Sequence, residues 1–141
     1  MRALSLTQPW ATALIVGVKQ IETRSWSTPY RGRIAIHAAK GFPEWAKAFA
    51  STEHTIGRFP GRFPRGVIVG VATIQDVCRT EELRGSLSAL ERLYGDYGAG
   101  RWGWVLPDIR ALPEPIACKG ALGLWTVPQD IVALIEATMA E

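Results

Sequence analysis

Three side chains that could do chemistry together lie within six positions of the stretch GVKQIETRSW, residues 17–26: Lys19, Glu22 and Arg24. A carboxylate beside two cations can accept hydrogen bonds from a nucleobase edge, while the lysine and the arginine hold a phosphate or a carbonyl oxygen. The same trio could transfer protons if burial lowered the pKa of the lysine or raised the pKa of the glutamate. The alternative interpretation is an ordinary ion pair on a solvated face.

The elements around this cluster must bring the three side chains to one place. Residues 7–17 carry apolar side chains at helical spacing, and residues 19–26 alternate as a strand does. Because residues two apart in a strand share a face, Glu22 and Arg24 are neighbours. Lys19 lies where the helix ends and the strand begins, so it can reach the same place from the side.

The rest of the chain predicts a mixed α+β fold in a single domain, residues 1–141. We expect further strands at 3–6, 31–39, 66–77, 101–109 and 121–127, and further helices at 43–52, 80–95 and 128–139. Strands and helices do not alternate regularly. A small mixed β-barrel of about six strands with three to four peripheral helices therefore fits better than a doubly wound sheet.

The charges are distributed unevenly along the sequence. Residues 23–75 hold eight basic residues against two acids, whereas residues 76–141 hold ten acids against six basic residues. A basic segment of this kind is built to face anions, and nucleic acid is the commonest large anion. The alternative is that these charges are spread around a solvated surface.

Composition argues against several other classes of protein. His37, His54, Cys78 and Cys118 have no metal-binding spacing, so we expect no metal site, no cofactor and two free thiols. No apolar run approaches the roughly 20 residues of a membrane span, which predicts no membrane association. The first residues lack the apolar region of a signal peptide, which predicts a cytoplasmic location.

The cluster lies in a motif that resembles a known family. The signature G-x-K-x-x-E-x-R of the ASCH domain, the activating signal cointegrator 1 homology module of the PUA-like superfamily, is met at Gly17, Lys19, Glu22 and Arg24. The flanking QPW and SWSTPYRGR are also similar to the cointegrator type of this domain, as are the later RGVIVGVATIQDV and EPIACKGALGLWTVP. The resemblance covers nearly the whole chain.

The resemblance implies a PUA-like β-barrel with a cleft beside the first helix, in which the family is proposed to bind RNA or a nucleotide. Unpaired bases need aromatic faces on which to stack, and Trp10, Trp26, Tyr30, Trp102 and Trp104 are the candidates, whereas Trp125 is expected in the core. The predicted ligand-binding residues are Gln8, Trp10, Lys19, Glu22, Arg24, Trp26, Arg31, Arg33 and His37. For His37, a hydrogen-bonded structural role is the stated alternative.

Some members of the family are described as enzymes, which gives a second reading. The resemblance implies an N4-acetylcytidine amidohydrolase or a ribonuclease with Lys19, Glu22 and Asp76 as catalytic residues. In the amidohydrolase type a threonine stands at the position of Glu22, and Asp76 matches the third catalytic group only approximately. A third reading is a protein-interaction module without activity on nucleic acid.

The segment IGRFPGRFPRG, residues 56–66, predicts an irregular loop. Arg58, Arg62 and Arg65 could lie along a nucleic-acid backbone while Phe59 and Phe63 stay available for bases. The alternative is a surface loop that its phenylalanines hold against the barrel. We expect a monomer, and the sequence does not identify a protein partner.

Overall fold

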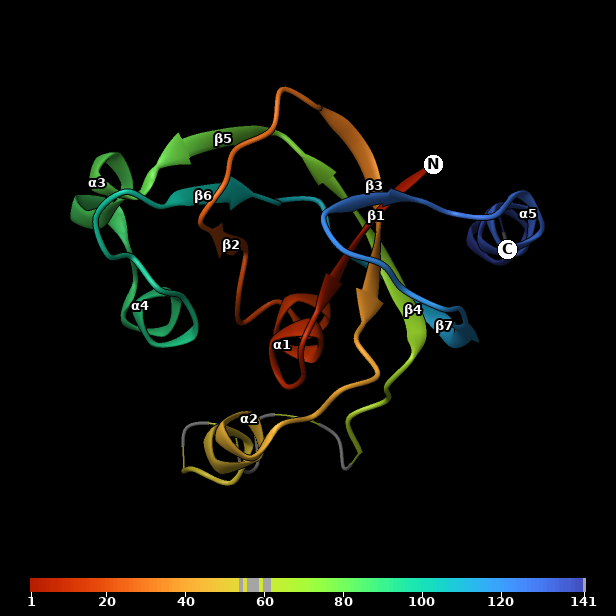
Figure 1. The fold of residues 1–141 in the computed structure, drawn as a ribbon, viewed down its shortest axis with the longest axis horizontal. Helices are drawn as coiled ribbons and strands as arrows, with labels where there is room; N and C mark the ends of the chain where they lie inside the picture. The colour runs from red at the N-terminus through yellow and green to blue at the C-terminus, as the bar shows by residue number, and fades with distance from the viewer. Residues whose placement is uncertain (54, 56–58, 60–61, 141) are drawn as a thin grey trace.

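The computed structural model describes residues 1–53, 55, 59 and 62–140. Within these residues the chain forms eight strands, five α-helices and one short 3₁₀ helix (Figure 1). The strands are β1 (Arg2–Leu6), β2 (Ile21–Arg24), β3 (Gly32–Ala38), β4 (Val67–Ile74), β5 (Asp76–Arg79), β6 (Trp102–Val105), β7 (Arg110–Ala117) and β8 (Leu124–Thr126). The helices are α1 (Trp10–Val16), α2 (Glu44–Ala50), α3 (Thr80–Leu83), η1 (Arg84–Ser86), α4 (Ala89–Tyr94) and α5 (Gln129–Met139).

The strands form two sheets. The larger has the strand order β7-β4-β3-β1-β8, and the smaller has the order β2-β6-β5. β1 and β3 run parallel, which places Ser5 opposite His37. In Figure 1 the smaller sheet lies on the side of α3 and α4, the larger sheet lies toward α5, and α1 lies between the two.

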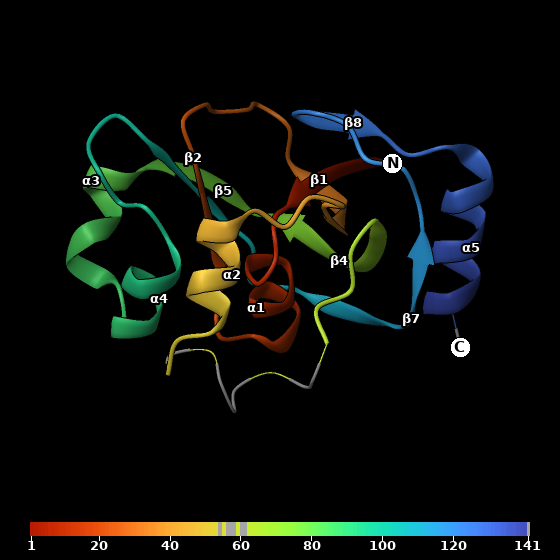
Figure 2. The same cartoon turned by 60° about the horizontal axis from the view of Figure 1, so that its bottom comes forward.

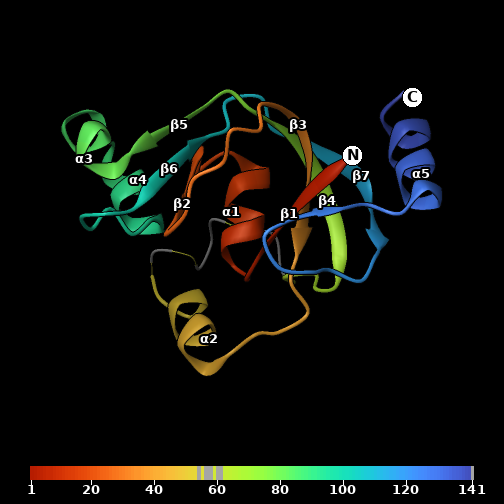
Figure 3. The same ribbon diagram turned by 45° about the horizontal axis from the view of Figure 1, so that its top comes forward.

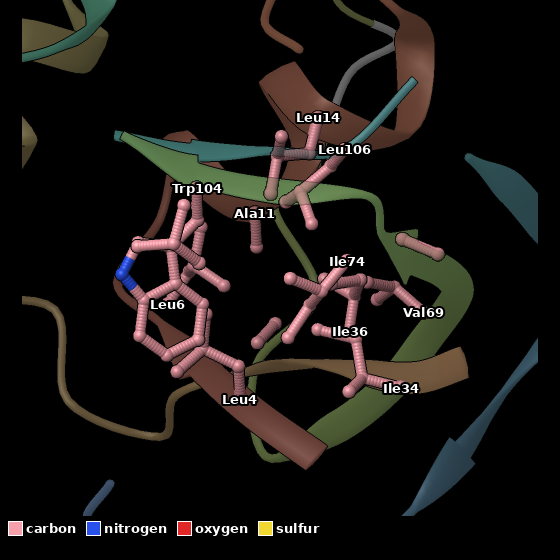
Figure 4. Packing of buried hydrophobic residues seen from close by; sticks show 13 residues of the cluster. Leu4, Leu6, Ala11, Leu14, Ile34, Ile36, Val69, Ile74, Trp104 and Leu106 are labelled. Carbon is pink, nitrogen blue, oxygen red and sulfur yellow. The ribbon is translucent and has the colours of Figure 1, made fainter. Parts of the chain in front are cut away.

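The main core fills the space between the two sheets. β1 contributes Leu4 and Leu6, α1 contributes Ala11 and Leu14, and β6 contributes Trp104, all of them buried (Figure 4). Because alternate residues of a strand share a face, the two leucines of β1 enter this core together. The core therefore joins both sheets through the first helix.

A second core lies on the other face of the larger sheet. Ala35 and Trp125 pack there against Val132 and Ile135 of α5. Figure 3 shows α5 alongside β7, on the far side of the sheet from α1. The burial of Trp125, which is 8% exposed, confirms the prediction that it belongs to a core.

Helix α2 lies beside α1 and not against a sheet, as Figure 2 shows. Its Trp45 and Phe49 are four residues apart, so they share one face of the helix. That face meets Trp10 at the start of α1, with ring centroids 5.5 Å from Trp45 and 5.0 Å from Phe49. An aromatic surface therefore borders the first helix.

The predicted α+β fold class is confirmed, but the predicted number of strands is too small. The expected strand over 66–77 divides at Gln75 into β4 and β5, which belong to different sheets. The structure adds β7, which pairs with β4 at the edge of the larger sheet. β7 was missed because Pro113 and Pro115 lack the N–H of a central strand, and an edge strand tolerates that loss.

Candidate functional site

A left-handed turn at Gly17 positions the cluster. Gly17 has a φ of 87°, and its N–H donates to the carbonyl of Leu14, which ends α1. The N–H of Lys19 then donates to the carbonyl of Ala13, so the chain folds back beside the helix before β2 begins. Glycine suits this position because a side chain is strained in the left-handed region.

Lys19 is fully buried, and its ammonium group is surrounded by oxygen atoms. Nζ donates to the carbonyl of Ile21 at 2.6 Å and to the carbonyl of Tyr94 at 3.0 Å, and it lies 3.2 Å from Oε1 of Glu22. An ammonium group has three N–H donors, and these three oxygens account for all of them. The lysine charge is thus buried with its compensating partners in place.

Glu22 joins the two cations. Its Oε1 faces Lys19, while its Oε2 accepts from Nε of Arg24 at 2.9 Å and lies 2.9 Å from Nη2 of the same guanidinium. Nη2 of Arg24 also donates to the carbonyl of Ser5 in β1 at 2.8 Å. The predicted proximity of the three side chains is therefore observed, and it ties β2 to β1.

A cavity of about 600 Å³ opens above this cluster. Glu22 and Arg24 form part of its polar floor, and Trp10, Trp45 and Phe49 form an aromatic wall. Lys19 is not in the lining, because it lies beneath Glu22. We call this space the first cavity.

Sequence reasoning missed several residues of the first cavity, among them Trp45, Phe49, Asp96 and Arg101. Trp45 is 64% exposed, and Asp96 and Arg101 come from the connection between α4 and β6. The spacing of Trp45 and Phe49 is a signal that was available in the sequence, because a large aromatic residue on the exposed face of a helix marks a contact surface. Asp96 and Arg101 gave no such signal.

Two further titratable groups lie near the cluster. Oε2 of Glu91 accepts from the N–H of Gln20 at 2.7 Å, and burial raises the pKa of Glu91. Burial also raises the pKa of Tyr97, and the negative charges of Glu91 and Glu22 raise it further. Oε1 of Glu91 and Oη of Tyr97 are buried without a hydrogen-bond partner in the described part of the chain.

The other predicted aromatic contacts lie against the core and not in the first cavity. Trp104 is fully buried, its ring stands edge-on to Trp26 with centroids 4.8 Å apart, and its Nε1 donates to the carbonyl of Trp26. Trp26, Tyr30 and Trp102 are partly buried hydrophobic residues that pack against the main core. Among the predicted tryptophans, the structure brings Trp10 to the first cavity.

Gln8 is buried completely and uses both ends of its amide. Its Nε2 donates to the carbonyl of Pro64 at 2.8 Å, and its Oε1 accepts from the N–H of Thr12 at 3.0 Å. The side chain therefore links the carbonyl of Pro64 to α1.

The structure places Asp76 away from the cluster. Asp76 begins β5, one strand beyond β6 from Glu22, and its side chain is 60% exposed. Its carboxylate lies 3.7 Å from Nη2 of Arg31, whose Nη1 donates to the carbonyls of Thr28 and Tyr30. Arg33 is exposed on β3 and, like Asp76 and Arg31, does not line the first cavity.

His37 takes part in a chain of hydrogen bonds on the other side of β1. Nε2 lies 2.7 Å from the carbonyl of Cys118, which only accepts, so Nε2 carries the proton and Nδ1 accepts from the Ser5 hydroxyl at 2.9 Å. Nε1 of Trp125 donates to the same hydroxyl oxygen at 3.0 Å. Burial lowers the pKa of His37, and the neutral ring fits these bonds.

The predicted basic loop is described in part. Arg58 lies outside the described residues, and Arg62 is exposed. Nη1 of Arg65 donates to the carbonyl of Lys40 at 3.1 Å, and its guanidinium lies over the ring of Phe42. The loop phenylalanines pack against each other and toward the protein, with Phe59 5.9 Å from Phe63 and 6.2 Å from Tyr94 between ring centroids.

The structure also bears on membrane spans, metal sites and disulfides. No helix in the described ranges has the length and the apolar character to cross a membrane. Within the same ranges, no three His, Cys, Asp or Glu side chains come together as a set of metal ligands. Cys78 and Cys118 are free thiols.

Curated proteins share part of this sequence. The chain is 34% identical over 87 residues to activating signal cointegrator 1 of Homo sapiens and 35% identical over 79 residues to the Mus musculus protein. These matches cover 57% and 52% of this chain, but only 15% and 14% of the relatives. The similarity therefore concerns one region of much longer proteins.

Solved structures share the fold. A crystal structure of ASCH from Zymomonas mobilis matches with a TM-score of 0.60 at 19% identity, covering 96% of this chain and 93% of that chain. A crystal structure of a mutant ASCH protein from the same organism matches with a TM-score of 0.59 at 20% identity, with 97% and 95% coverage. At this level of identity the likeness shows the fold alone.

The family model of the ASCH domain matches residues 4–113. This range contains both sides of the first cavity and all three residues of the cluster. On this match the chain belongs to the ASCH domain family.

Proposed function

We propose that this protein binds single-stranded RNA or a nucleotide in the first cavity. The observation that carries the proposal is the arrangement of an aromatic wall beside a fixed carboxylate and guanidinium. A base can stack on the wall formed by Trp10, Trp45 and Phe49 while its polar edge meets Glu22 and Arg24. The association of the ASCH family with RNA binding supports the proposal.

The contacts of the cluster give each residue a role. The side chains of Glu22 and Arg24 are 12% and 24% exposed, so each presents an edge to the cavity. Glu22 accepts from a base donor, and Arg24 donates to a phosphate or carbonyl oxygen. Lys19 acts as a positioning residue, because its ammonium holds the Glu22 carboxylate from below.

The same contacts favour binding over hydrolysis. A lysine that acts as a general base must be neutral and must reach the substrate, whereas Lys19 is buried and donates to oxygens on three residues. Asp76, the third proposed catalytic group, lies outside the first cavity. Hydrolysis is therefore the alternative outcome of the experiment below.

Trp45→Ala tests the stacking wall. Because Trp45 is 64% exposed, its removal changes the thermal midpoint little. We expect the affinity for a single-stranded RNA of about eight nucleotides to fall by about tenfold, given about 1–3 kcal/mol per stacked base. Fluorescence anisotropy measures the affinity, and Leu134→Ala, an exposed hydrophobic residue on α5, is the matched control.

Glu22→Gln tests the polar floor and the alternative together. The amide keeps the shape of the side chain but loses the charge that holds Lys19 and Arg24. We expect the variant to bind RNA more weakly than the wild type. Chromatography of RNA and of N4-acetylcytidine incubated with each protein should show no product. Substoichiometric turnover by the wild type that the variant loses would replace the binding proposal with the hydrolytic one.

A further inference from the structure

A second cavity, of about 910 Å³, lies on the other side of β1. Ser5 lines both cavities: its carbonyl accepts from Arg24 and its hydroxyl bonds to His37. The two spaces are therefore neighbours that share the end of one strand. Neither the cluster nor the aromatic wall of the first cavity reaches the second.

The second cavity is basic. Lys40 follows β3, Arg65 belongs to the segment before β4, and Lys119 lies between β7 and β8, so three separate parts of the chain each supply a cation. None of the described residues that line the cavity is acidic. A concave surface with cations and no carboxylate attracts an anion.

The floor of the second cavity is fixed by close packing. A Cβ atom on Gly120 would lie 2.5 Å from Cε1 of His37 and 2.9 Å from Oγ of Ser5, so the backbone of Gly120 covers this pair. His37 also donates to the carbonyl of Cys118. The backbone of Lys119 is thus held between two anchored residues, Cys118 and Gly120.

This geometry makes the pair of Ser5 and His37 part of the floor and not a nucleophile and its base. The Ser5 oxygen already donates to His37 and accepts from Trp125. The backbone of Gly120 packs closely against the pair. The chemistry that the second cavity offers is therefore binding by Lys40, Arg65 and Lys119.

The wall of the second cavity is apolar. Small side chains at Ala39, Ala117 and Ala121 line it, and Leu122, which is 97% exposed, stands at its rim. An apolar wall next to cations suits a ligand with a flat apolar body and a negative charge. A nucleotide has both features, because its base is planar and its phosphate is anionic.

We infer that the second cavity is a nucleotide subsite, in which Lys40, Arg65 and Lys119 hold phosphate and the wall at Leu122 receives the base. This inference rests on the proposed function, since the first cavity lies across Ser5 and would take another nucleotide of the same strand. The shared chemistry allows a free nucleotide as well as a unit of RNA, and the experiment separates them.

The test removes the three cations together. The triple variant Lys40→Ala, Arg65→Ala, Lys119→Ala is compared with a control triple variant of exposed cations that line neither cavity, Arg79→Ala, Arg84→Ala, Arg110→Ala. Anisotropy with an RNA of about eight nucleotides is measured over a range of salt concentrations. We expect the first triple to bind at least about tenfold more weakly, with a log–log salt slope smaller by about 2, at about 0.7 per phosphate contact.

Leu122→Ser tests the base contact separately. The residue is so exposed that its substitution leaves the fold intact, and we expect a smaller loss of RNA affinity without a change in salt slope. An equal loss in both triple variants would show that only net charge matters and would overturn the inference. Unchanged affinity of the first triple would also overturn it and would leave the proposed function standing.

A titration with uridine monophosphate, followed by amide chemical shifts, separates the two proposals. If the wild type binds no RNA and uridine monophosphate shifts no amide of the first cavity, the proposed function is wrong and no strand occupies both cavities. Shifts at Gly120 and Ala121 would then assign the second cavity to free nucleotides, whereas unshifted amides there would overturn the inference. With RNA binding intact, loss only in the first triple supports a strand that occupies both cavities.

Discussion

Lys19 holds a positive charge where protein oxygens replace water. Its partners are the backbone carbonyls of Ile21 and Tyr94 and the carboxylate of Glu22. The two carbonyls accept from the ammonium in the interior of the protein. Removing one member of such a set leaves the others buried without that partner. The free-energy cost of that loss exceeds the net stabilisation that the intact interaction provides. The cluster therefore stabilises the fold in addition to forming the floor of the first cavity.

Lys19→Met should therefore destabilise the fold strongly. The substitution keeps most of the side-chain volume but removes the ammonium donor from the carbonyls of Ile21 and Tyr94 and the cation from beside Glu22. We expect the free energy of unfolding to fall by about 3 kcal/mol, measured by urea denaturation. Lys119→Met, at an exposed position, should change it by less than about 0.5 kcal/mol. Equal changes in the two variants would contradict this account.

His37 makes stability depend on pH. Burial lowers its pKa below the ordinary value of 6.5, so in the window between the folded and unfolded pKa values the unfolded chain binds more protons. This contribution to stability is complete above about pH 6.5 and is lost progressively as the pH falls toward the folded pKa. Thermal midpoints between about pH 7 and 5 should therefore fall less steeply in His37→Gln than in the wild type. Parallel curves would show that other groups carry the dependence.

At the scale of elements, the turn after α1 decides where the cluster lies. Gly17 adopts a φ of 87°, and no atom lies near the position of an added Cβ. A side chain there would strain the backbone but would not clash with a neighbour. The path from helix to strand thus depends on backbone conformation at one residue.

Gly17→Ala should lower the free energy of unfolding by about 1–2 kcal/mol, the difference that L-residues show in the left-handed region. Gly85 in η1 also has open space around it but needs no positive φ, so Gly85→Ala should be neutral or slightly stabilising. Urea denaturation of both variants checks the prediction, and equal effects would contradict it.

Local patterns predicted the elements well. The end of α1 at Gly17 follows from helix-end chemistry. The strand expected over 31–39 forms as β3, whose alternate residues Ile34 and Ile36 face the main core while Ala35 faces the second core. The helix expected over 80–95 is divided in the structure into α3, η1 and α4, with Gly85 in η1. These predictions depend on neighbours in sequence, which a single chain reveals.

Non-local contacts could not be predicted in the same way. The carbonyl that receives the Lys19 ammonium belongs to Tyr94, 75 residues away, and no spacing rule connects the two. The separation of Asp76 from Glu22 depends on strand order, with β6 between β5 and β2. The second cavity likewise arises from segments that meet only in the folded chain.

At the scale of the whole molecule, we propose that residues 1–141 fold as one unit. The ASCH model ends at residue 113, but β8 pairs with β1 and α5 covers the second core. The segment beyond the family match therefore completes the larger sheet and buries its outer face.

A chain that ends at residue 113 should not fold cooperatively. It lacks Trp125, Val132 and Ile135, so Ala35 and Val71 lose the apolar residues that cover them. We expect no sharp thermal transition by circular dichroism and rapid digestion by protease, whereas a chain ending at residue 139 retains both a sharp transition and resistance to protease. A cooperative transition in the shorter chain would show that the second core is dispensable.

The pairing of β1 with β8 has a consequence for synthesis on the ribosome. Ala3 lies opposite Trp125, so two strands from distant parts of the sequence must meet before the larger sheet has all its neighbours. Until Trp125 has emerged, one edge of β1 keeps unpaired backbone groups that other chains can contact. Contacts at such long sequence separation also slow folding. The nascent protein therefore keeps one exposed strand edge, which favours aggregation, until β8 emerges.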